Sequence, residues 1–199
     1  MLVLSAGQLA ALFPHMDAPT VEVARDLFVL RPFDAAACAE IRTAAAAARA
    51  WRAAGINADL EVNRAVRNAE VLQETENPQL VARVRDLLFG ATRALAATLA
   101  PGTALAELQI VRYGAGGRYV EHRDTPSPGA TPRALSLVWY LNDDFAGGAT
   151  VFLDGEVTLQ PLTGVVAAFL PTLLHRAEPV TSGTKYAVTA WYHVPPLSR

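Results

Sequence analysis

The feature that most constrains the fold is a change of pattern near Leu105. From that point onward, short apolar runs recur and are separated by Gly, Pro, Asn and Asp residues. The eight runs are Leu108–Tyr113, Tyr119–His122, Ala134–Leu141, Ala149–Leu153, Val157–Leu159, Val165–Leu170, His175–Pro179 and Lys185–Val194. Short strands at this spacing are typical of a β-sandwich or barrel. A further strand is expected at Phe28–Leu30, at the N-terminal edge of the sheet.

The residues before this change carry helical patterns. Asp34 is placed as an N-cap, 12 alanines follow within Ala35–Ala54, and Gly55 stands where a C-cap glycine belongs. We therefore expect a helix over Ala35–Ala54. A second helix is expected to begin at Asn77 and to end at Pro101, because its apolar residues recur every three or four positions. Each helix has one apolar face that suits packing against a sheet.

Length and composition narrow the class of protein. With 199 residues, the chain has room for one domain, and we expect residues 1–199 to form a single unit. Hydrophobic residues make up 52% and charged residues 18%, which excludes a disordered chain. The net charge of −2 gives no basic excess, so a nucleic-acid partner is not expected. Cys38 is the only cysteine, which excludes an intramolecular disulfide and a cysteine-based zinc site.

The sequence shows no targeting or membrane segment. The apolar stretch Met1–Phe13 lacks the basic start and the cleavage site of a signal peptide. No run approaches the roughly 18 uncharged apolar residues of a membrane span, because arginines interrupt the Ala-rich stretch. We therefore expect a cytoplasmic protein without a membrane partner. The oligomeric state is left open.

Two segments have the composition of loops that cover a site. Gly55–Glu76 shows weak periodicity, which favours neither a helix nor a strand. Thr125–Pro132 contains three prolines in eight residues, and this excludes a central strand there. We expect both segments to act as mobile cover.

His122 and Asp124 form an H-x-D pair. On a strand, the two-residue spacing points both side chains to the same face. One imidazole and one carboxylate are two of the three ligands of a 2-His-1-carboxylate site, which is the arrangement of non-haem Fe(II) oxygenases. The alternative is an exposed pair at the end of a strand. His175, 53 residues further on, is the candidate for the third ligand, although a single histidine is more often structural than a ligand.

Lys185 begins the last apolar run. In a strand, alternation places Lys185, Ala187, Thr189 and Trp191 on one face. A lysine at this position usually extends its ammonium to solvent, but an ammonium that points into a barrel must be paired. A bound dicarboxylate satisfies that requirement. His193 is in phase with Lys185 but roughly 26 Å away along the strand at about 3.3 Å per residue, so we do not expect it to share the site.

A longer series of residues surrounds these candidates in a fixed order. It consists of Tyr113-Gly114, Tyr119, His122-Arg123-Asp124, Arg133, Tyr140-Leu141-Asn142, Gly147-Gly148-Ala149-Thr150-Val151-Phe152, Pro161, Gly164, His175, Val180, Gly183, Lys185 and Trp191. The series resembles the Fe(II)/2-oxoglutarate-dependent oxygenase superfamily, and more closely its prolyl 4-hydroxylase branch. The resemblance covers somewhat under half of the chain. One departure is Lys185, because the oxygen-sensing prolyl hydroxylases have an arginine there.

The resemblance implies a mainly β, α+β fold with a double-stranded β-helix (jelly-roll) core and N-terminal helices packed on one sheet. Residues 105–194 would form the catalytic core, and residues 1–104 the helical support and the flap. The resemblance also implies that His122, Asp124 and His175 bind Fe(II) and are the catalytic residues. 2-Oxoglutarate and O2 are the implied cosubstrates, with ascorbate as the reductant.

By the same resemblance, the distal carboxylate of 2-oxoglutarate pairs with Lys185 and accepts a hydrogen bond from a tyrosine. Tyr113 and Tyr140 occupy the two family positions near the cosubstrate, and Thr189 shares the face of Lys185. Each tyrosine is equally well explained as a core aromatic with a satisfied hydroxyl group. Trp191 is expected to form part of the wall of the substrate pocket, with plain core packing as the alternative.

The implied reaction is hydroxylation of an unactivated C–H bond, with release of succinate and CO2. The expected substrate is a prolyl residue or an amino-acid-like small molecule. In relatives, the segment upstream of the H-x-D strand covers the substrate, and here Asn57–Glu76 takes that place. Arg67 in this segment is a candidate for binding a substrate carboxylate, and the alternative is an ordinary solvated arginine. The oxidised carbon, and hydroxylation as against desaturation or ring closure, stay open.

Two other classes of function are kept as alternatives. A cupin-like metal enzyme does not use 2-oxoglutarate and does not need Lys185, but the usual cupin site has more histidines than this chain offers. A non-catalytic jelly-roll binding module is the other alternative. The complete set of three ligands argues against it, because a degenerate module would normally have lost one of them.

Overall fold

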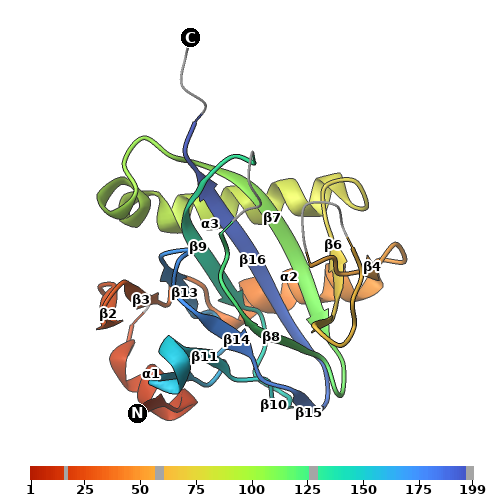
Figure 1. The fold of residues 1–199 in the computed structure, drawn as a ribbon, viewed down its shortest axis with the longest axis horizontal. Coiled ribbons are helices and arrows are strands. Elements are labelled where there is room, and N and C mark those ends of the chain that lie inside the picture. Colours follow the sequence, from red (N-terminus) through yellow and green to blue (C-terminus); the bar gives the residue numbers. More distant parts are fainter. Residues whose placement is uncertain (16–17, 57–60, 126–129, 196–199) are drawn as a thin grey trace.

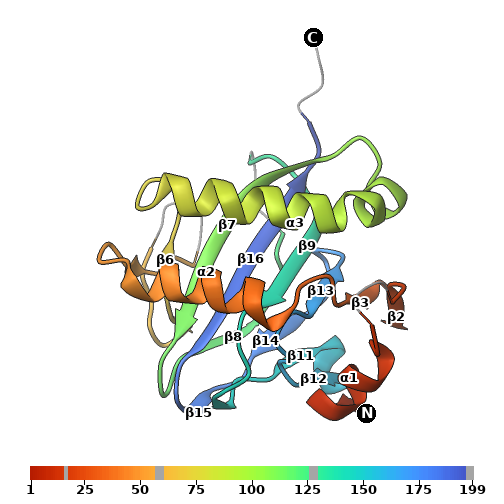
Figure 2. The ribbon, with the colours of Figure 1, turned by 180° about the vertical axis from the view of Figure 1, so that it is seen from behind.

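The structure, a computed structural model, describes residues 1–15, 18–56, 61–125 and 130–195. In these ranges the chain forms two facing β-sheets, and two helices cover the outer face of the larger sheet (Figures 1 and 2). The helices are α1 (Ala6–Leu12), α2 (Ala35–Ala47) and α3 (Pro78–Leu99), with one 3-10 turn at Leu153–Gly155. This arrangement confirms the predicted mainly β fold with helices on one sheet.

The larger sheet has eight strands. Their order is β2 (Val21–Ala24), β3 (Leu27–Leu30), β13 (Val166–Phe169), β9 (Arg133–Tyr140), β16 (Lys185–His193), β7 (Ala104–Tyr113), β6 (Glu70–Leu72) and β4 (Arg52–Ala53). Strand β16 pairs antiparallel with β7 on one side and with β9 on the other. The middle of the sheet is therefore built from the three longest strands.

The smaller sheet has six strands and lies against the other face of the larger one (Figure 1). Their order is β1 (Leu2–Leu4), β12 (Val157–Leu159), β11 (Thr150–Phe152), β14 (His175–Ala177), β8 (Arg118–His122) and β5 (Arg67–Asn68). A separate two-stranded ribbon joins β10 (Ala146–Gly147) to β15 (Val180–Ser182). Strands from both sheets contribute to two apolar clusters, which pack the sheets together.

Helix α3 forms as predicted. The Asn77 side chain accepts a hydrogen bond from the backbone N–H of Leu80 at 3.2 Å, and Pro78 opens the helix. The buried residues Val84 and Leu88 belong to an apolar cluster that also contains Ile110 of β7. A helical period of apolar residues therefore produced one face that packs on the sheet.

Helix α2 ends at Ala47, so the predicted helix over Ala35–Ala54 is too long by seven residues, and Gly55 is not its C-cap. Ala48 is already extended, and the indole of Trp51 donates a hydrogen bond to the carbonyl of Ala45 at 3.2 Å. The next residues then pair with β6 as strand β4. Sheet pairing and the packing of one tryptophan thus override the helix propensity of alanine.

All eight predicted strands after Leu105 are present, with ends shifted by up to four residues. The strand expected at Phe28–Leu30 is also present, but it is not at the edge, because β2 lies outside it. Part of the expected cover Gly55–Glu76 is built into the sheets: β5 pairs with β8 and β6 pairs with β7. Residues 57–60, which include Asn57, and residues 126–129, which are half of Thr125–Pro132, lie outside the described residues.

Strand β16 separates two environments. Lys185, Ala187, Thr189 and Trp191 line a cavity between the sheets, as the alternation predicts. The intervening residues Val188, Ala190 and Tyr192 are buried in the cluster beneath the helices. Within the described ranges, none of the helices combines the length and the apolar character that crossing a bilayer requires.

Candidate active site

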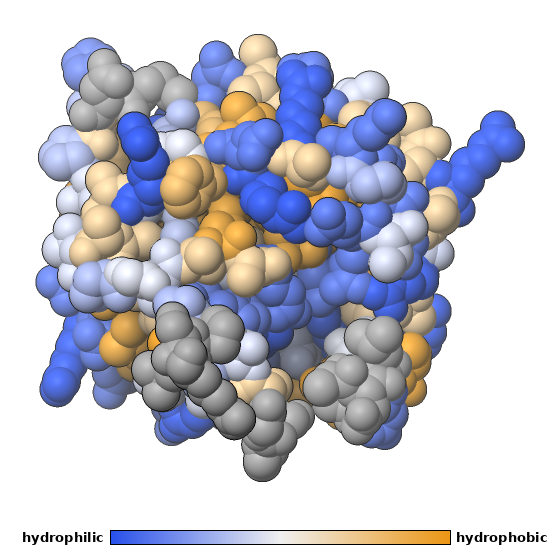
Figure 3. Space-filling model, turned by 90° about the horizontal axis from the view of Figure 1, so that it is seen from above, coloured by the Kyte–Doolittle hydropathy of each residue, from blue (hydrophilic) through white to orange (hydrophobic). Residues whose placement is uncertain are grey.

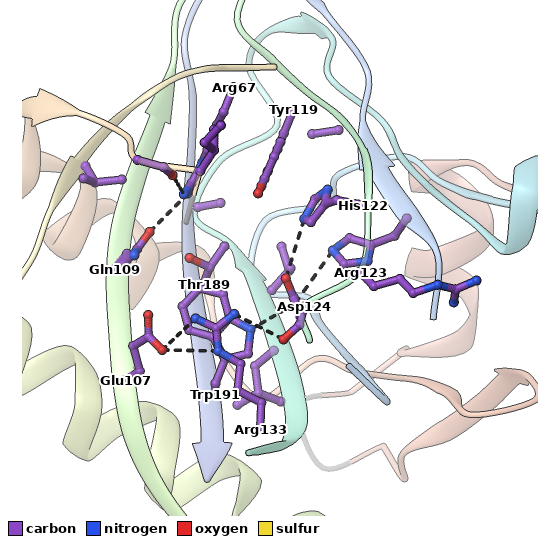
Figure 4. A pocket seen from close by; sticks show the side chains of 18 of the residues that line it. Arg67, Glu107, Gln109, Tyr119, His122, Arg123, Asp124, Arg133, Thr189 and Trp191 are labelled. Atoms are coloured by element: carbon purple, nitrogen blue, oxygen red, sulfur yellow. Dashed lines mark hydrogen bonds and ion pairs between the residues drawn. The ribbon is translucent and has the colours of Figure 1, made fainter. Parts of the chain in front are cut away.

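Two strands of the smaller sheet bring His122, Asp124 and His175 together. His122 on β8 lies opposite His175 on β14 in the antiparallel register, and Asp124 follows the end of β8. One ligand atom from each residue lies within 4.8 Å of the others. His122 Nε2 is 3.5 Å from Asp124 Oδ1, and His175 Nε2 is 3.8 Å from Asp124 Oδ2 (Figure 4). The spacing of these atoms suits one metal ion.

Both imidazoles are oriented by backbone carbonyl groups. The Nδ1 atom of His122 lies 2.8 Å from the carbonyl oxygen of Val120, and that of His175 lies 3.0 Å from the carbonyl oxygen of Leu173. A proton on each Nδ1 satisfies these contacts and leaves both Nε2 lone pairs free to bind a metal. The ring of Tyr119 stacks on His122 at 3.6 Å, which further fixes that imidazole. The donor set therefore fits Fe(II).

The protonation states also suit a cation. Burial by itself raises the pKa of the Asp124 carboxyl, but hydrogen bonding to His122, the charges of the two histidines and the Trp191 indole together hold it well below its ordinary value. Burial lowers the pKa of His175 to about 4, so this imidazole is neutral at pH 7. Metal ligands must be deprotonated, and Asp124 and His175 are already in that form at pH 7.

Trp191 contacts the candidate ligand Asp124 directly. Its indole N–H donates a hydrogen bond to Asp124 Oδ2 at 2.9 Å. The guanidinium of Arg133 stacks on the Trp191 ring at 3.9 Å, donates to the backbone oxygen of Asp124, and pairs with Glu107 at 2.7 Å. These contacts fix one carboxylate oxygen of Asp124. The sequence alone predicts no role for Arg133 or Glu107, because β7 and β9 become neighbours of β16 only through long-range pairing.

Lys185 is buried on the floor of the same cavity, with 2% of its surface exposed. Its Nζ donates to the carbonyl of Gly148 at 2.7 Å and lies 5.6 Å and 5.3 Å from the ring centres of Tyr113 and Tyr140. Within the described ranges it has no carboxylate partner. Burial lowers the pKa of its ammonium to about 7. A buried ammonium without a counter-ion favours an anionic ligand.

The other cosubstrate candidates differ in their exposure to the cavity. Tyr113 lines it, and burial raises the pKa of its phenol. Tyr140 is fully buried, and its hydroxyl donates to Thr150 Oγ1 at 2.8 Å. Of these two residues, Thr150 is the one that lines the cavity. Thr189 Oγ1 is buried and has no hydrogen-bond partner among the described residues. Tyr113 and Thr150 thus offer hydroxyl groups at the end of the cavity that holds Lys185, whereas Thr189 lies four residues further along β16, about 13 Å away at about 3.3 Å per residue.

The cavity measures about 390 Å³ and is lined from both sheets. Figure 4 shows Arg67 and Tyr119 toward one end, Glu107, Arg133 and Trp191 toward the other, and His122 with Asp124 at the side. His193 also lines the cavity and lies 3.4 Å from Glu107, so the prediction that it does not share the site is wrong. The cavity runs along β16, so residues at both ends of this strand line it.

The cavity is lined by both polar and apolar residues. On the face of the molecule seen from above (Figure 3), hydrophilic and hydrophobic side chains are likewise interspersed. Apolar side chains together with a small number of polar groups are usual in the lining of a small-molecule site.

Comparison with known proteins gives one family match. Residues 108–193 match the family model described as the 2OG-Fe(II) oxygenase superfamily. Prolyl 4-hydroxylase subunit alpha-3 of Rattus norvegicus is 34% identical over 104 residues, which is 43% of this chain and 19% of that protein. A putative prolyl 4-hydroxylase of Acanthamoeba polyphaga mimivirus is 30% identical over 106 residues, which is 43% of this chain and 44% of that protein. The chain thus spans less than half the length of these relatives.

Solved structures share the fold. A prolyl hydroxylase in complex with a hypoxia-inducible-factor peptide, from Trichoplax adhaerens, has a TM-score of 0.66 and 16% identity over 96% of this chain and 87% of that one. A viral collagen prolyl hydroxylase of Paramecium bursaria Chlorella virus-1, in complex with 2OG, has a TM-score of 0.64 and 19% identity over 85% and 97%. These likenesses confirm the predicted jelly-roll core.

Proposed function

We propose that the protein is an Fe(II)- and 2-oxoglutarate-dependent dioxygenase, because residues 108–193 match the model of the 2OG-Fe(II) oxygenase superfamily. The proposed reaction hydroxylates an unactivated C–H bond and releases succinate and CO2. The proposed substrate is a prolyl residue or an amino-acid-like small molecule. The observation that carries this proposal is that the His122, Asp124 and His175 cluster and the unpaired ammonium of Lys185 line one cavity.

In this proposal each residue has a defined task. His122, Asp124 and His175 hold Fe(II), which together with 2-oxoglutarate and O2 supplies the oxidising power for the C–H bond. Lys185 binds the distal carboxylate of the cosubstrate and Tyr113 offers that carboxylate a hydroxyl group, while Thr189 offers a hydroxyl group further along the cavity. Tyr140 acts through its hydrogen bond to Thr150. Trp191 forms the wall beside Asp124.

The rest of the chain supports this core. We propose that residues 1–199 act as one domain, with residues 105–194 as the catalytic core and residues 1–104 as its helical support and flap. Packing of α2 and α3 on the larger sheet supports this division. We also propose that the protein works in the cytoplasm and takes ascorbate as its reductant.

The direct test is anaerobic addition of Fe(II) and then 2-oxoglutarate, with detection of the weak visible charge-transfer band of the chelate. We expect the band in the wild type and its absence in His175→Ala. In Lys185→Ala, iron binding should persist while the 2-oxoglutarate concentration needed for the band rises roughly 10- to 100-fold, because a charge-assisted contact is lost. Arg64→Gln, an exposed arginine, is the control that should leave the band unchanged.

Two results would contradict the proposal. Iron binding without the band would point to a cupin-like metal enzyme that does not use 2-oxoglutarate. A protein that binds no iron would instead be a non-catalytic jelly-roll binding module.

A further inference from the structure

Arg67 is a second buried cation in the wall of the cavity. It lies on the edge strand β5, and 7% of its surface is exposed. Its Nη1 donates to the carbonyl of Gly55 at 3.0 Å, and its Nη2 donates to Gln109 Oε1 at 3.1 Å. Its Nε is buried and has no hydrogen-bond partner in the described part of the chain. The expected alternative of an ordinary solvated arginine is therefore wrong.

The partners of Arg67 are all neutral. Gly55 and Gln109 orient the guanidinium, which also interacts with the Tyr113 hydroxyl, but none of these groups compensates its charge, and no acidic side chain among the described residues pairs with it. Three other arginines at this cavity have acidic partners: Arg133 pairs with Glu107 at 2.7 Å, Arg52 with Glu76 at 3.0 Å and Arg176 with Glu178 at 2.7 Å. The fourth, Arg123, is exposed, so water can solvate its charge. A buried, uncompensated guanidinium is costly and favours an anionic ligand.

Among the described residues that line the cavity, Lys185 and Arg67 are the buried cations without an acidic partner, and a count of charges distinguishes them. In the proposed function, the distal carboxylate of 2-oxoglutarate compensates Lys185. The carboxylate of Asp124 and the remaining carboxylate of the cosubstrate compensate the metal ion. Arg67 then keeps one buried positive charge that the filled cosubstrate site does not neutralise. The group that neutralises it must arrive with the other substrate.

The position of Arg67 limits the shape of that substrate. The guanidinium lies 4.9 Å above the ring centre of Tyr119, and the same ring stacks on His122 at 3.6 Å. Only one aromatic layer therefore separates Arg67 from a candidate metal ligand. An anion bound here lies one aromatic ring away from the candidate metal ligand His122, and a residue inside a peptide has no free backbone carboxylate to place there.

From these contacts we propose that Arg67 binds a carboxylate of the primary substrate. The substrate class is then a proline-type molecule with a free carboxylate, either the free imino acid or the C-terminal residue of a peptide. This inference rests on the proposed function and narrows its substrate. The planar fork of arginine matches a carboxylate with two parallel hydrogen bonds.

The experiment compares carboxylate and amide probes on the enzyme loaded anaerobically with Fe(II) and 2-oxoglutarate. Affinity is measured by calorimetry and by the change of the charge-transfer band. One pair of probes is L-proline and L-prolinamide, and the other is Gly-Gly-Pro and its C-terminal amide. We expect the carboxylate of at least one pair to bind about 10-fold or more tightly than its amide. The pair that responds distinguishes a free substrate from a peptide C-terminus.

Substitutions of Arg67 test whether its guanidinium causes the preference for carboxylate over amide. Arg67→Gln should remove the difference between carboxylate and amide, and Arg67→Lys should restore part of it, because lysine keeps the charge but loses the fork. Thermal unfolding of both variants checks that they fold. Arg64→Gln, on the same segment but exposed, should keep the full preference.

Several outcomes would overturn the inference while leaving the proposed function intact. In all of them the band forms in the wild type. The first is equal binding of carboxylate and amide, and the second is no binding of either carboxylate probe. The third is an increase in the 2-oxoglutarate dissociation constant of Arg67→Gln without loss of the probe preference. If the wild type forms no band at all, the proposed function itself fails.

Discussion

At the scale of single residues, the electrostatics of the cavity depend on Lys185, which is the only lysine of the chain. Its pKa falls from an ordinary 10.5 to about 7 because burial penalises the charged form. Between these two pH values the unfolded chain binds a proton that the folded protein does not. The contribution of this residue to the free energy of unfolding therefore rises with pH over that window.

Binding of 2-oxoglutarate should reverse this shift. A dianion stabilises the ammonium, so above pH 7 binding is expected to take up a proton, and affinity should fall by at most roughly tenfold per pH unit. Because there is only one lysine, protein labelled with 13C-lysine has a single Cε signal that reports its protonation. A titration midpoint near 10 in the free protein would refute the argument, and Lys185→Met should abolish the pH dependence of affinity.

A second prediction at this scale concerns the indole that binds Asp124. Trp191→Phe removes the hydrogen bond to Oδ2 while keeping an aromatic ring beneath Arg133. Loss of such an orienting contact usually lowers metal affinity roughly 10- to 100-fold. We expect this loss in a competition titration for Fe(II), with little change in 2-oxoglutarate affinity at saturating iron. Trp51→Phe, whose indole bonds Ala45 instead, is the matched control and should bind iron normally.

At the scale of elements, the sequence pattern predicted those helices and strands whose residues face one partner along their whole length. The period of α3 and the alternation of β16 were predicted correctly, because in each the same residues face one partner along the whole element. Helix α2 was predicted too long, because its end depends on pairing of β4 with β6. Strand β1 was not predicted, since three residues near the N-terminus pair with β12, whose residues begin at Val157.

The site was predictable to a similar degree. His122 and Asp124 of the H-x-D pair line one cavity together with Lys185, as expected. The direct register of His122 with His175 could not be inferred, because 53 residues separate them in the sequence. Gln109 and Glu107 were missed for the same reason: their strand meets the cavity through its pairing with β16.

One prediction tests an element alone. Asn77 caps α3 by accepting the N–H of Leu80, so Asn77→Ala should lower the free energy of unfolding by about 1 kcal/mol. Denaturant unfolding measures this change. Thr98→Ala, an exposed position near the end of the same helix, should change it by less than about 0.5 kcal/mol. Equal effects of the two substitutions would contradict the role of the cap.

At the scale of the whole molecule, the candidate metal ligands join two strands of the smaller sheet and are assembled only in the folded chain. A ligand that binds only the folded state stabilises it by about 2.7 kcal/mol at 100 times its dissociation constant. For a chain of this size, that corresponds to a rise in Tm of roughly 5–10 °C. The stability of the protein should therefore depend on its metal content.

This prediction is checked by thermal unfolding with and without Fe(II) under anaerobic conditions. The wild type and Arg64→Gln should both show the rise, and a chelator should reverse it. His175→Ala should unfold at one temperature whatever the metal concentration. A similar rise in that variant would mean that the stabilising ion binds elsewhere.

Strand β5 has a consequence for how such an enzyme can diversify. It joins the smaller sheet at its edge through only two residues, and one of them is Arg67. The strands that carry His122, His175 and Lys185 are paired on both sides. Substitutions in this short edge strand can therefore change substrate preference during evolution without altering the candidate metal ligands. Closely related enzymes can in this way come to accept different molecules.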